Sequence, residues 1–207
     1  MCGICGIINF NKEKINREKI SSMVKMMKHR GPDDDGIYQN NNFALGSTRL
    51  SILDLSNDGH MPMFSNDKRF VIVYNGEIYN HIELKNELSS FYKFKSKSDT
   101  EVVLAAYQKW GKKSLEKFNG MFSFVIYDHY KKTFFAARDR YGIKPFYYYY
   151  DSSIFIFSSE IYPIINSFNY LKEPNNKSIY NYLIFNKTNQ TSDTFFKNIK
   201  KLQHGHY

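Results

Sequence analysis

The sequence is poor in cysteine and contains no long apolar run. Its 207 residues include only Cys2 and Cys5, which lie too close together to form a useful disulfide and have no metal-ligand spacing around them. No apolar stretch is long enough to span a bilayer, and the start of the chain does not have a signal-peptide pattern. These absences exclude a disulfide scaffold, predict no membrane association and favour the reducing setting of the cytoplasm.

Glycine and proline are also sparse, at 11 and 5 residues, and no stretch of them marks a linker. The length suits one domain, or one domain with an appendage, so we expect a single unit over residues 1–207. Acidic residues number 20 against 29 Lys and Arg, which gives a formal net charge of +9. Such an excess can indicate nucleic-acid binding, but the lysines are dispersed among acidic residues. A solvated basic surface without a nucleic-acid partner is therefore expected.

Short strands and helices alternate in the first half of the sequence. Strand patterns occur at 5–10, 43–45 and 70–74. Helical patterns occur at 16–27, 80–91 and 98–111. Asn16 is the expected N-cap of the first helix, and Asn80 with Glu83 resembles a capping box. HRGPDDDG, residues 29–36, is expected to end the first helix and begin a polar turn.

The second half is dominated by aromatic and β-branched strands separated by turns. These strands are expected in MFSFVIYD, TFFAARD, PFYYYY and IFIFSS, and further helices around 160–166 and 178–185. Strands that follow one another through short turns pair antiparallel. The whole pattern predicts a layered antiparallel α+β fold.

Cys2 directly follows the initiator methionine, where a thiol contributes little to structure. Removal of Met1 is favoured when the second residue is small, and Cys2 would then carry both a thiol and a free α-amine. Reference pKa values of about 7.7–8.0 for the amine and about 8.5 for the thiol make proton transfer between them nearly isoenergetic. Cys2 is therefore a candidate nucleophile with its own base. The alternative is that Met1 stays and Cys2 is an ordinary edge residue.

Asn75-Gly76 follows the strand pattern at 70–74. The side-chain amide of Asn75 and the backbone N–H of Gly76 can point the same way and hold an oxyanion. A plain hairpin turn is the alternative, because Asn-Gly is a common turn dipeptide.

Two charged residues suit the two ends of an amino-acid zwitterion. Arg49 lies among apolar neighbours in TRLSI, where its guanidinium group can grip a carboxylate bidentately or form a structural ion pair. Asp99 begins a helical pattern in KSDTEV, where it can attract a substrate ammonium group or cap the helix. The six histidines show no spacing typical of a metal site or a Cys–His protease, although a Cys2–His81 pair stays an alternative.

Seven segments stand in an order and spacing that identify a family. They are MCGICGI, HRGPDDDG, RLSILDLS, YNGEIYNHIELKNEL, SDTEVVLAAYQKWG, NGMFSFVIYD and RDRYGIKPFYY. Together they resemble the glutaminase domain of glutamine-hydrolysing asparagine synthetase, a class II glutamine amidotransferase. The RLSI and YNGEIYNH forms resemble this branch more than the glucosamine-phosphate or phosphoribosyl branches. The resemblance implies an α+β fold of the N-terminal-nucleophile hydrolase type, a four-layer αββα sandwich with two antiparallel sheets.

The resemblance also implies a role for each candidate residue. Cys2 would be the mature N-terminus and the nucleophile that releases ammonia from the glutamine side chain, leaving a thioester that water hydrolyses to glutamate. Asn75 and the Gly76 N–H resemble the oxyanion hole. Arg49 is implied to bind the α-carboxylate of glutamine and Asp99 its α-ammonium group. Residues implied to line the pocket with their backbone are Leu50, Ser51, Ile52, Leu53, Gly76 and Glu77.

The family continues into a synthetase domain that binds ATP and magnesium and activates aspartate. This sequence ends at LQHGHY and has no Ser-Gly-Gly-rich pyrophosphate loop. We therefore expect no cofactor or metal within residues 1–207, and delivery of ammonia to a C-terminal synthetase domain or a separate synthetase subunit. A homodimer is one arrangement open to the full-length enzyme, and an exposed apolar patch is expected where the synthetase sits. The alternatives are a glutaminase serving another amide-forming synthetase and a non-catalytic regulatory module.

Overall fold

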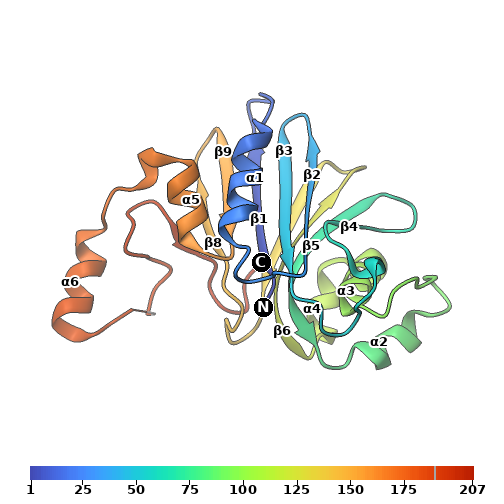
Figure 1. Cartoon of the computed structure of the whole chain (residues 1–207). Coiled ribbons are helices and arrows are strands. Elements are labelled where there is room, and N and C mark those ends of the chain that lie inside the picture. The colour runs from blue at the N-terminus through green and yellow to red at the C-terminus, as the bar shows by residue number, and fades with distance from the viewer. Residues whose placement is uncertain (189) are drawn as a thin grey trace.

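The computed structural model describes residues 1–188 and 190–207, and their strands form two antiparallel sheets (Figure 1). Sheet A has the order β10-β8-β9-β1-β3-β2. Its strands are β1 (Gly3–Asn9), β2 (Asp34–Asn40), β3 (Phe43–Arg49), β8 (Tyr147–Tyr150), β9 (Ile154–Ser158) and β10 (Lys200–Lys201). Sheet B has the order β4-β5-β6-β7. Its strands are β4 (Met63–Phe64), β5 (Phe70–Ile78), β6 (Gly120–Asp128) and β7 (Thr133–Arg138).

Helices cover the outer face of each sheet (Figure 1). The helices are α1 (Arg17–Met26), α2 (His81–Leu88), α3 (Asp99–Trp110), α4 (Ser114–Lys117), α5 (Ile161–Ser167) and α6 (Asn176–Phe185). α1 and α5 pack on sheet A, and α2 and α3 pack on sheet B. α6 lies away from both sheets in Figure 1, and none of its residues is buried.

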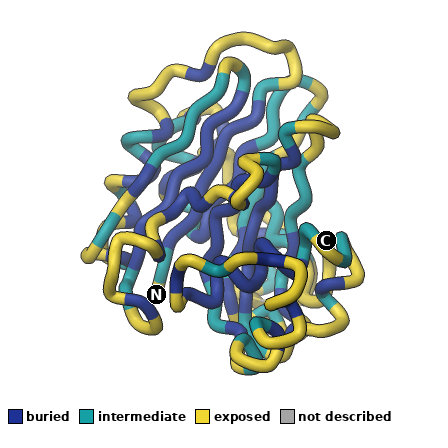
Figure 2. The backbone as a smooth tube through the Cα atoms, turned by 90° about the vertical axis from the view of Figure 1, so that its right-hand side faces the viewer, coloured by how far each residue is buried: buried dark blue, intermediate teal, exposed yellow. Residues whose placement is uncertain are grey.

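Three apolar cores hold these layers together. The central core joins the sheets, for example through Ile4 and Leu45 of sheet A against Val73 of sheet B. The outer cores join each sheet to its helices. Ile20 of α1 lies in the core on sheet A, and Leu104 of α3 lies in the core on sheet B. Because side chains alternate along a strand, strands buried on both faces supply two cores at once. Figure 2 shows this as central strands that are dark blue, with exposed loops in yellow. The predicted four layers and two antiparallel sheets are confirmed.

Local signals predicted α1 well but gave wrong interpretations elsewhere. Asn16 caps α1 as expected, since its Oδ1 accepts from the backbone N–H of Glu18 at 2.8 Å. The capping box at Asn80 is wrong: its side chain donates to the carbonyl of Lys117 and accepts from the N–H of Asn119. The polar turn expected at 29–36 is shorter, because β2 already begins at Asp34.

The alternative of a hairpin turn at Asn75-Gly76 is wrong. β5 continues through both residues to Ile78, with Asn75 opposite Ser123 and Gly76 opposite Phe122 of β6. A strand partner distant in sequence thus outweighs the turn preference of the dipeptide.

An ion pair that contributes to stability joins Asp128, at the start of the β6–β7 turn, to Arg69, the residue before β5. Asp128 is buried, accepts hydrogen bonds from the Nε and Nη2 of Arg69, and also accepts from the N–H groups of Tyr130 and Lys131. The Arg69 guanidinium holds the pKa of Asp128 at about 2, against 3.8 without these contacts. Because the pKa is lowered in the folded state, the stabilisation is complete above about pH 4 and disappears as the pH falls toward 2.

Asp128→Asn is therefore expected to lower the free energy of unfolding by about 2 kcal/mol near pH 6, and to differ little from the wild type at pH 2. Urea unfolding followed by circular dichroism between pH 2 and 6 measures this difference. Asp35→Asn, which removes an exposed ion pair with Lys28, is the control and should change stability by less than about 0.5 kcal/mol. Equal stability of Asp128→Asn and wild type at pH 6 would contradict the assignment.

Candidate active site

A cavity of about 180 Å³ lies where β3, β5 and the start of α3 meet the N-terminus. It is lined by nine of the ten residues predicted from the sequence: Cys2, Arg49, Leu50, Ile52, Leu53, Asn75, Gly76, Glu77 and Asp99. Ser51 does not line it, and its backbone N–H donates to Asp33 Oδ2 at 2.7 Å. Residues from four separate segments therefore surround one small hollow.

Cys2 immediately precedes β1, the central strand that pairs with β3 and β9. Its carbonyl accepts a hydrogen bond from Arg30 Nε at 3.0 Å, and Arg30 is held in turn by Glu160 at 3.0 Å. The thiol lies 3.8 Å from the carbonyl oxygen of Leu50, and burial raises the pKa of the Cys2 thiol. Met1 also lines the cavity and is 56% exposed. The sulfur is thus fixed at the cavity while the residue before it reaches solvent.

Asn75 is fully buried in β5, and neither its Nδ2 nor its Oδ1 has a hydrogen-bond partner among the described residues. Leaving a buried amide unsatisfied costs about 1–3 kcal/mol per group, so the site has a donor and an acceptor that await a ligand. Gly76 is required beside it, because a Cβ there would lie 2.6 Å from the carbonyl oxygen of Met121.

Arg49 ends β3, and its buried guanidinium group holds the following loop. Nη1 donates to the carbonyl of Ser56 at 2.9 Å, and Nη2 donates to the carbonyl of Asp54. Gly59 leaves room for this group, since a Cβ there would lie 2.0 Å from Arg49 Nη2. Within the described part of the chain Arg49 forms no ion pair, so the alternative of a structural ion pair is wrong.

Asp99 is the first residue of α3 and is buried. Its Oδ2 accepts from the hydroxyl of Tyr74 at 2.6 Å and from the N–H of Ile78 at 2.9 Å. Burial raises the pKa of Asp99, and these two hydrogen bonds oppose that rise. The alternative that Asp99 caps the helix is wrong, because Ser98 Oγ accepts from the N–H of Thr100 and is the cap.

Asp54 links the loop after Arg49 to the segment before Asp99. One carboxylate oxygen accepts from the N–H of Ser56 at 2.9 Å, and the other accepts from the N–H of Lys97 at 2.7 Å. Sequence reasoning missed Asp54, Tyr74 and Arg30, although all three lie within or next to the segments that identify the family. His81 bonds to the carbonyl of Ile78 at 3.0 Å and does not line the cavity, so nothing here supports a Cys2–His81 pair.

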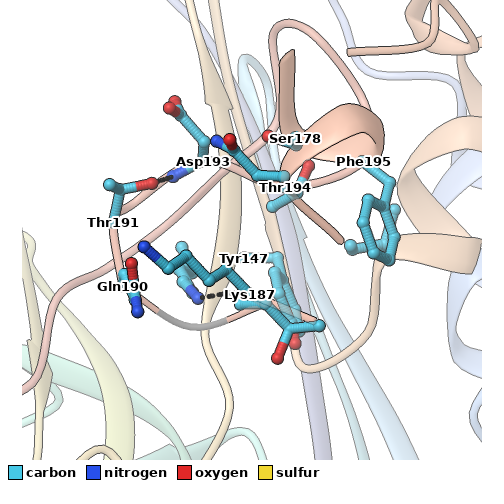
Figure 3. A pocket seen from close by; sticks show the side chains of 12 residues that line it. Tyr147, Ser178, Lys187, Gln190, Thr191, Asp193, Thr194 and Phe195 are labelled. Atoms are coloured by element: carbon cyan, nitrogen blue, oxygen red, sulfur yellow. Dashed lines mark hydrogen bonds between the residues drawn. The ribbon is translucent and has the colours of Figure 1, made fainter. Parts of the chain in front are cut away.

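A second cavity, of about 240 Å³, lies between α6 and the segment before β10 (Figure 3). It has no cysteine, and its one carboxylate, Asp193, forms an ion pair with Lys200. Among the described residues, no group of three or more His, Cys, Asp and Glu side chains is placed to hold a metal ion. The same residues include no helix that is long and apolar enough to cross a membrane. The cavity around Cys2 is therefore the candidate site.

A family model for the glutamine amidotransferase domain matches residues 1–207. The chain belongs to this family. Its relatives include a putative glutamine-hydrolysing asparagine synthetase 2 of Methanocaldococcus jannaschii, 48% identical over 183 residues, which cover 80% of this chain and 35% of the relative. Asparagine synthetase 1 of Bacillus subtilis is 36% identical over 99% of this chain and 33% of its own length. The chain thus spans about a third of the curated relatives that it matches.

Solved structures support the same fold. A glutamine phosphoribosylpyrophosphate amidotransferase from Bacillus subtilis superposes with a TM-score of 0.68 at 19% identity, covering 80% of this chain and 43% of that one. At this identity the likeness concerns the fold alone. It confirms the αββα sandwich of two antiparallel sheets that the sequence predicts for this glutamine amidotransferase domain.

The raised pKa of Asp99 gives a pH-dependent stability that can be measured. The folded state keeps the Asp99 proton more readily than the unfolded state does, so the contribution of Asp99 to the free energy of unfolding falls as the pH rises above about 4. Asp99→Asn removes this loss and should be more stable than the wild type at pH 7, with the gain shrinking toward acidic pH. Urea unfolding at pH 4 to 7 tests this, with the exposed Asp58→Asn as control. The assignment would be refuted if the stability of Asp99→Asn relative to the wild type were lower at pH 7 than at pH 4.

Proposed function

We propose that the chain hydrolyses L-glutamine to glutamate and ammonia through a thioester on Cys2. The observation that carries the proposal is the unpartnered, buried amide of Asn75 in the same cavity as Cys2, Arg49 and Asp99. A nucleophile, an oxyanion donor, a cation and an anion around 180 Å³ match one small amino acid with a reactive side-chain amide.

The two charged residues would hold the backbone end of glutamine. Arg49 would bind the α-carboxylate, because its guanidinium group is buried and, among the described residues, bonds only to neutral carbonyl groups. Asp99 would bind the α-ammonium group, since its Oδ1 accepts no hydrogen bond from the described residues. That ammonium charge would favour the ionised carboxylate and offset the effect of burial. The loop at Leu50–Leu53 and Glu77 would enclose the substrate between them.

The chemistry would begin once Met1 is removed. The thiol proton moves to the freed α-amine of Cys2, and the sulfur attacks the amide carbon of glutamine. The carbonyl electron pair moves to oxygen, where the Asn75 Nδ2 and the Gly76 N–H donate to the oxyanion. The α-amine of Cys2, now protonated, then gives this proton to the leaving nitrogen, so that the C–N bond breaks and ammonia departs as the thioester forms. Water, deprotonated by the same amine, hydrolyses the thioester to glutamate.

The ammonia would serve the synthesis of asparagine from aspartate, as the names of the curated relatives suggest. That step would need ATP and magnesium bound by a synthetase part outside residues 1–207, covalently joined or separate. Exposed apolar side chains on α6, which include Leu183, Ile184 and Phe185, are consistent with contact to such a partner. A homodimer is one arrangement open to the full-length enzyme. The alternatives are a glutaminase that serves another amide-forming synthetase, which only the synthetase partner can separate from this proposal, and a non-catalytic regulatory module, which a glutaminase measurement separates.

Exposure of the Cys2 amine is expected to switch the activity on. A protease recognition sequence placed directly before Cys2 yields matched samples before and after cleavage, and mass spectrometry verifies each N-terminus. Glutamate release should appear only after cleavage, and Cys2→Ala should remain folded and show background rates. Equal activity in the uncleaved sample would rule out the amine as the base, and inactivity of the cleaved sample would overturn the proposed function.

Asn75→Ala is expected to lower kcat for glutamine by about 10²–10³, because one oxyanion donor is lost. Stability should change little or rise, since a buried amide without partners is removed. Steady-state kinetics together with urea unfolding measure both quantities, and Asn86→Ala on the exposed face of α2 is the control. A kcat within threefold of the wild type would remove Asn75 from the mechanism.

A further inference from the structure

The RDRYGIKP segment is one of the motifs that identify the family, yet the steps above assign it no role. It follows β7 and contains Lys144, which lines the cavity of Cys2. Lys144 is the one lysine among the buried residues that the structure describes, with 5% of its surface exposed. Its ammonium group forms no hydrogen bond and no ion pair with any residue that the structure describes. The side chain is enclosed, and its Nζ, which stays accessible at the tip, has no partner among the described residues, so this charge calls for an explanation.

The loop before Lys144 is built to keep this lysine in place. Asp139 is fully buried, and its two oxygens accept from the N–H groups of Tyr141, Ile143, Lys144 and Phe122 at 2.9–3.2 Å. Arg138 Nε donates to the carbonyl of Lys144 at 2.7 Å, and Gly142 turns the chain with a φ of +65°. The carboxylate of Asp139 is thus occupied by backbone N–H groups. The backbone of Lys144 is held at its N–H by Asp139 and at its carbonyl by Arg138.

Lys144 and Cys2 line the same cavity, and Cys2 is the charged group with the largest effect on the pKa of Lys144. Burial lowers the pKa of Lys144, and among the charged groups the Cys2 sulfur acts on it most strongly, in the opposite direction. After burial and the contact with the Leu50 carbonyl, the pKa of the Cys2 thiol is lowered by the N-terminal ammonium group, raised by Asp99 and lowered by Arg49. The glutamine zwitterion would neutralise the two side chains. The other charged groups that act on Lys144 are Arg30, Glu77 and Asp139.

We propose, on the basis of the function proposed above, that Lys144 is a positioning residue whose ammonium group stabilises the Cys2 thiolate. The thiol proton leaves Sγ for the α-amino nitrogen of Cys2, and the electron pair left on sulfur lies in the field of Lys144 until it forms the bond to the amide carbon. Burial of the sulfur disfavours this thiolate, and the buried cation compensates for that effect. The unpaired charge of Lys144 thereby acquires its partner during the reaction.

The test measures the thiolate directly, without requiring turnover. Met1-free protein is alkylated with iodoacetamide from pH 5.5 to 10, and mass spectrometry follows the Cys2 and Cys5 peptides separately. Lys144→Met should raise the apparent pKa of Cys2 alkylation by about one unit and slow the reaction at pH 7 several-fold. Lys144→Arg should restore the wild-type profile. Lys113→Met, an exposed lysine elsewhere, makes the same change in net charge and should have no effect.

Kinetics provide the second readout. If the wild type hydrolyses glutamine, Lys144→Met should lower kcat several-fold and leave KM within about twofold. A wild-type alkylation profile in folded Lys144→Met would overturn the proposal, whatever the glutaminase result. Lys144→Gln is the second neutral variant, and failure of both neutral variants to fold would assign the charge to folding and likewise overturn it. An inactive wild type with a shifted profile in Lys144→Met would refute the glutaminase function and keep the thiolate role.

Discussion

The face-to-face packing of the two sheets is the constraint on which the site depends. The inner core sets Ile4 and Leu45 of sheet A against Val73 of sheet B. Since side chains alternate along strands, Arg49 shares the inner face with Leu45, and Asn75 shares it with Val73. The candidate nucleophile, carboxylate-binding cation and oxyanion donor thus come from two sheets that meet because their apolar residues must be buried. A one-residue slip of β5 would turn Asn75 to the opposite face.

Because side chains alternate along β5, neighbouring residues of this strand face different layers. Tyr74, one residue before Asn75, points to the outer face of sheet B, where its hydroxyl bonds to Asp99 at the start of α3. In the proposed function the helix layer would therefore supply the anion for the ammonium end of the substrate, and the sheet interface would supply the groups around its reacting end. Asp54 joins the two by bonding to Ser56 on one side and Lys97 on the other.

Local patterns were enough to predict features whose partners are near in sequence. The Asn16 cap and the four hairpin strands of the second half are of this kind. Features with distant partners were misjudged: Asn75-Gly76 is a strand because β6 lies beside it, and Asn80 bonds to a segment nearly 40 residues away. Cys2, Arg49, Asn75, Gly76 and Asp99 were candidates from their own chemistry, with alternatives open, and the family resemblance assigned their roles and added the residues that line the pocket with their backbone. Nine of the ten residues line one cavity. Their hydrogen bonds, and the burial of Lys144, depend on tertiary packing that no local pattern encodes.

The site is costly for the fold, and that cost indicates where function lies. Asn75 lacks partners, and burial disfavours the charged forms of Cys2, Asp99 and Lys144. Elsewhere the buried carboxylate of Asp139 is satisfied by four N–H groups, although single polar atoms of Tyr92, Gln108 and Ser167 also lack partners among the described residues. The combination that sets the site apart is a side chain with no partner for either polar atom, Asn75, in one cavity with three groups whose charged forms burial disfavours. It is explained if these groups find their partners during the reaction. The zwitterion of the substrate would pair with Asp99, its oxyanion with Asn75, and the Cys2 thiolate with Lys144.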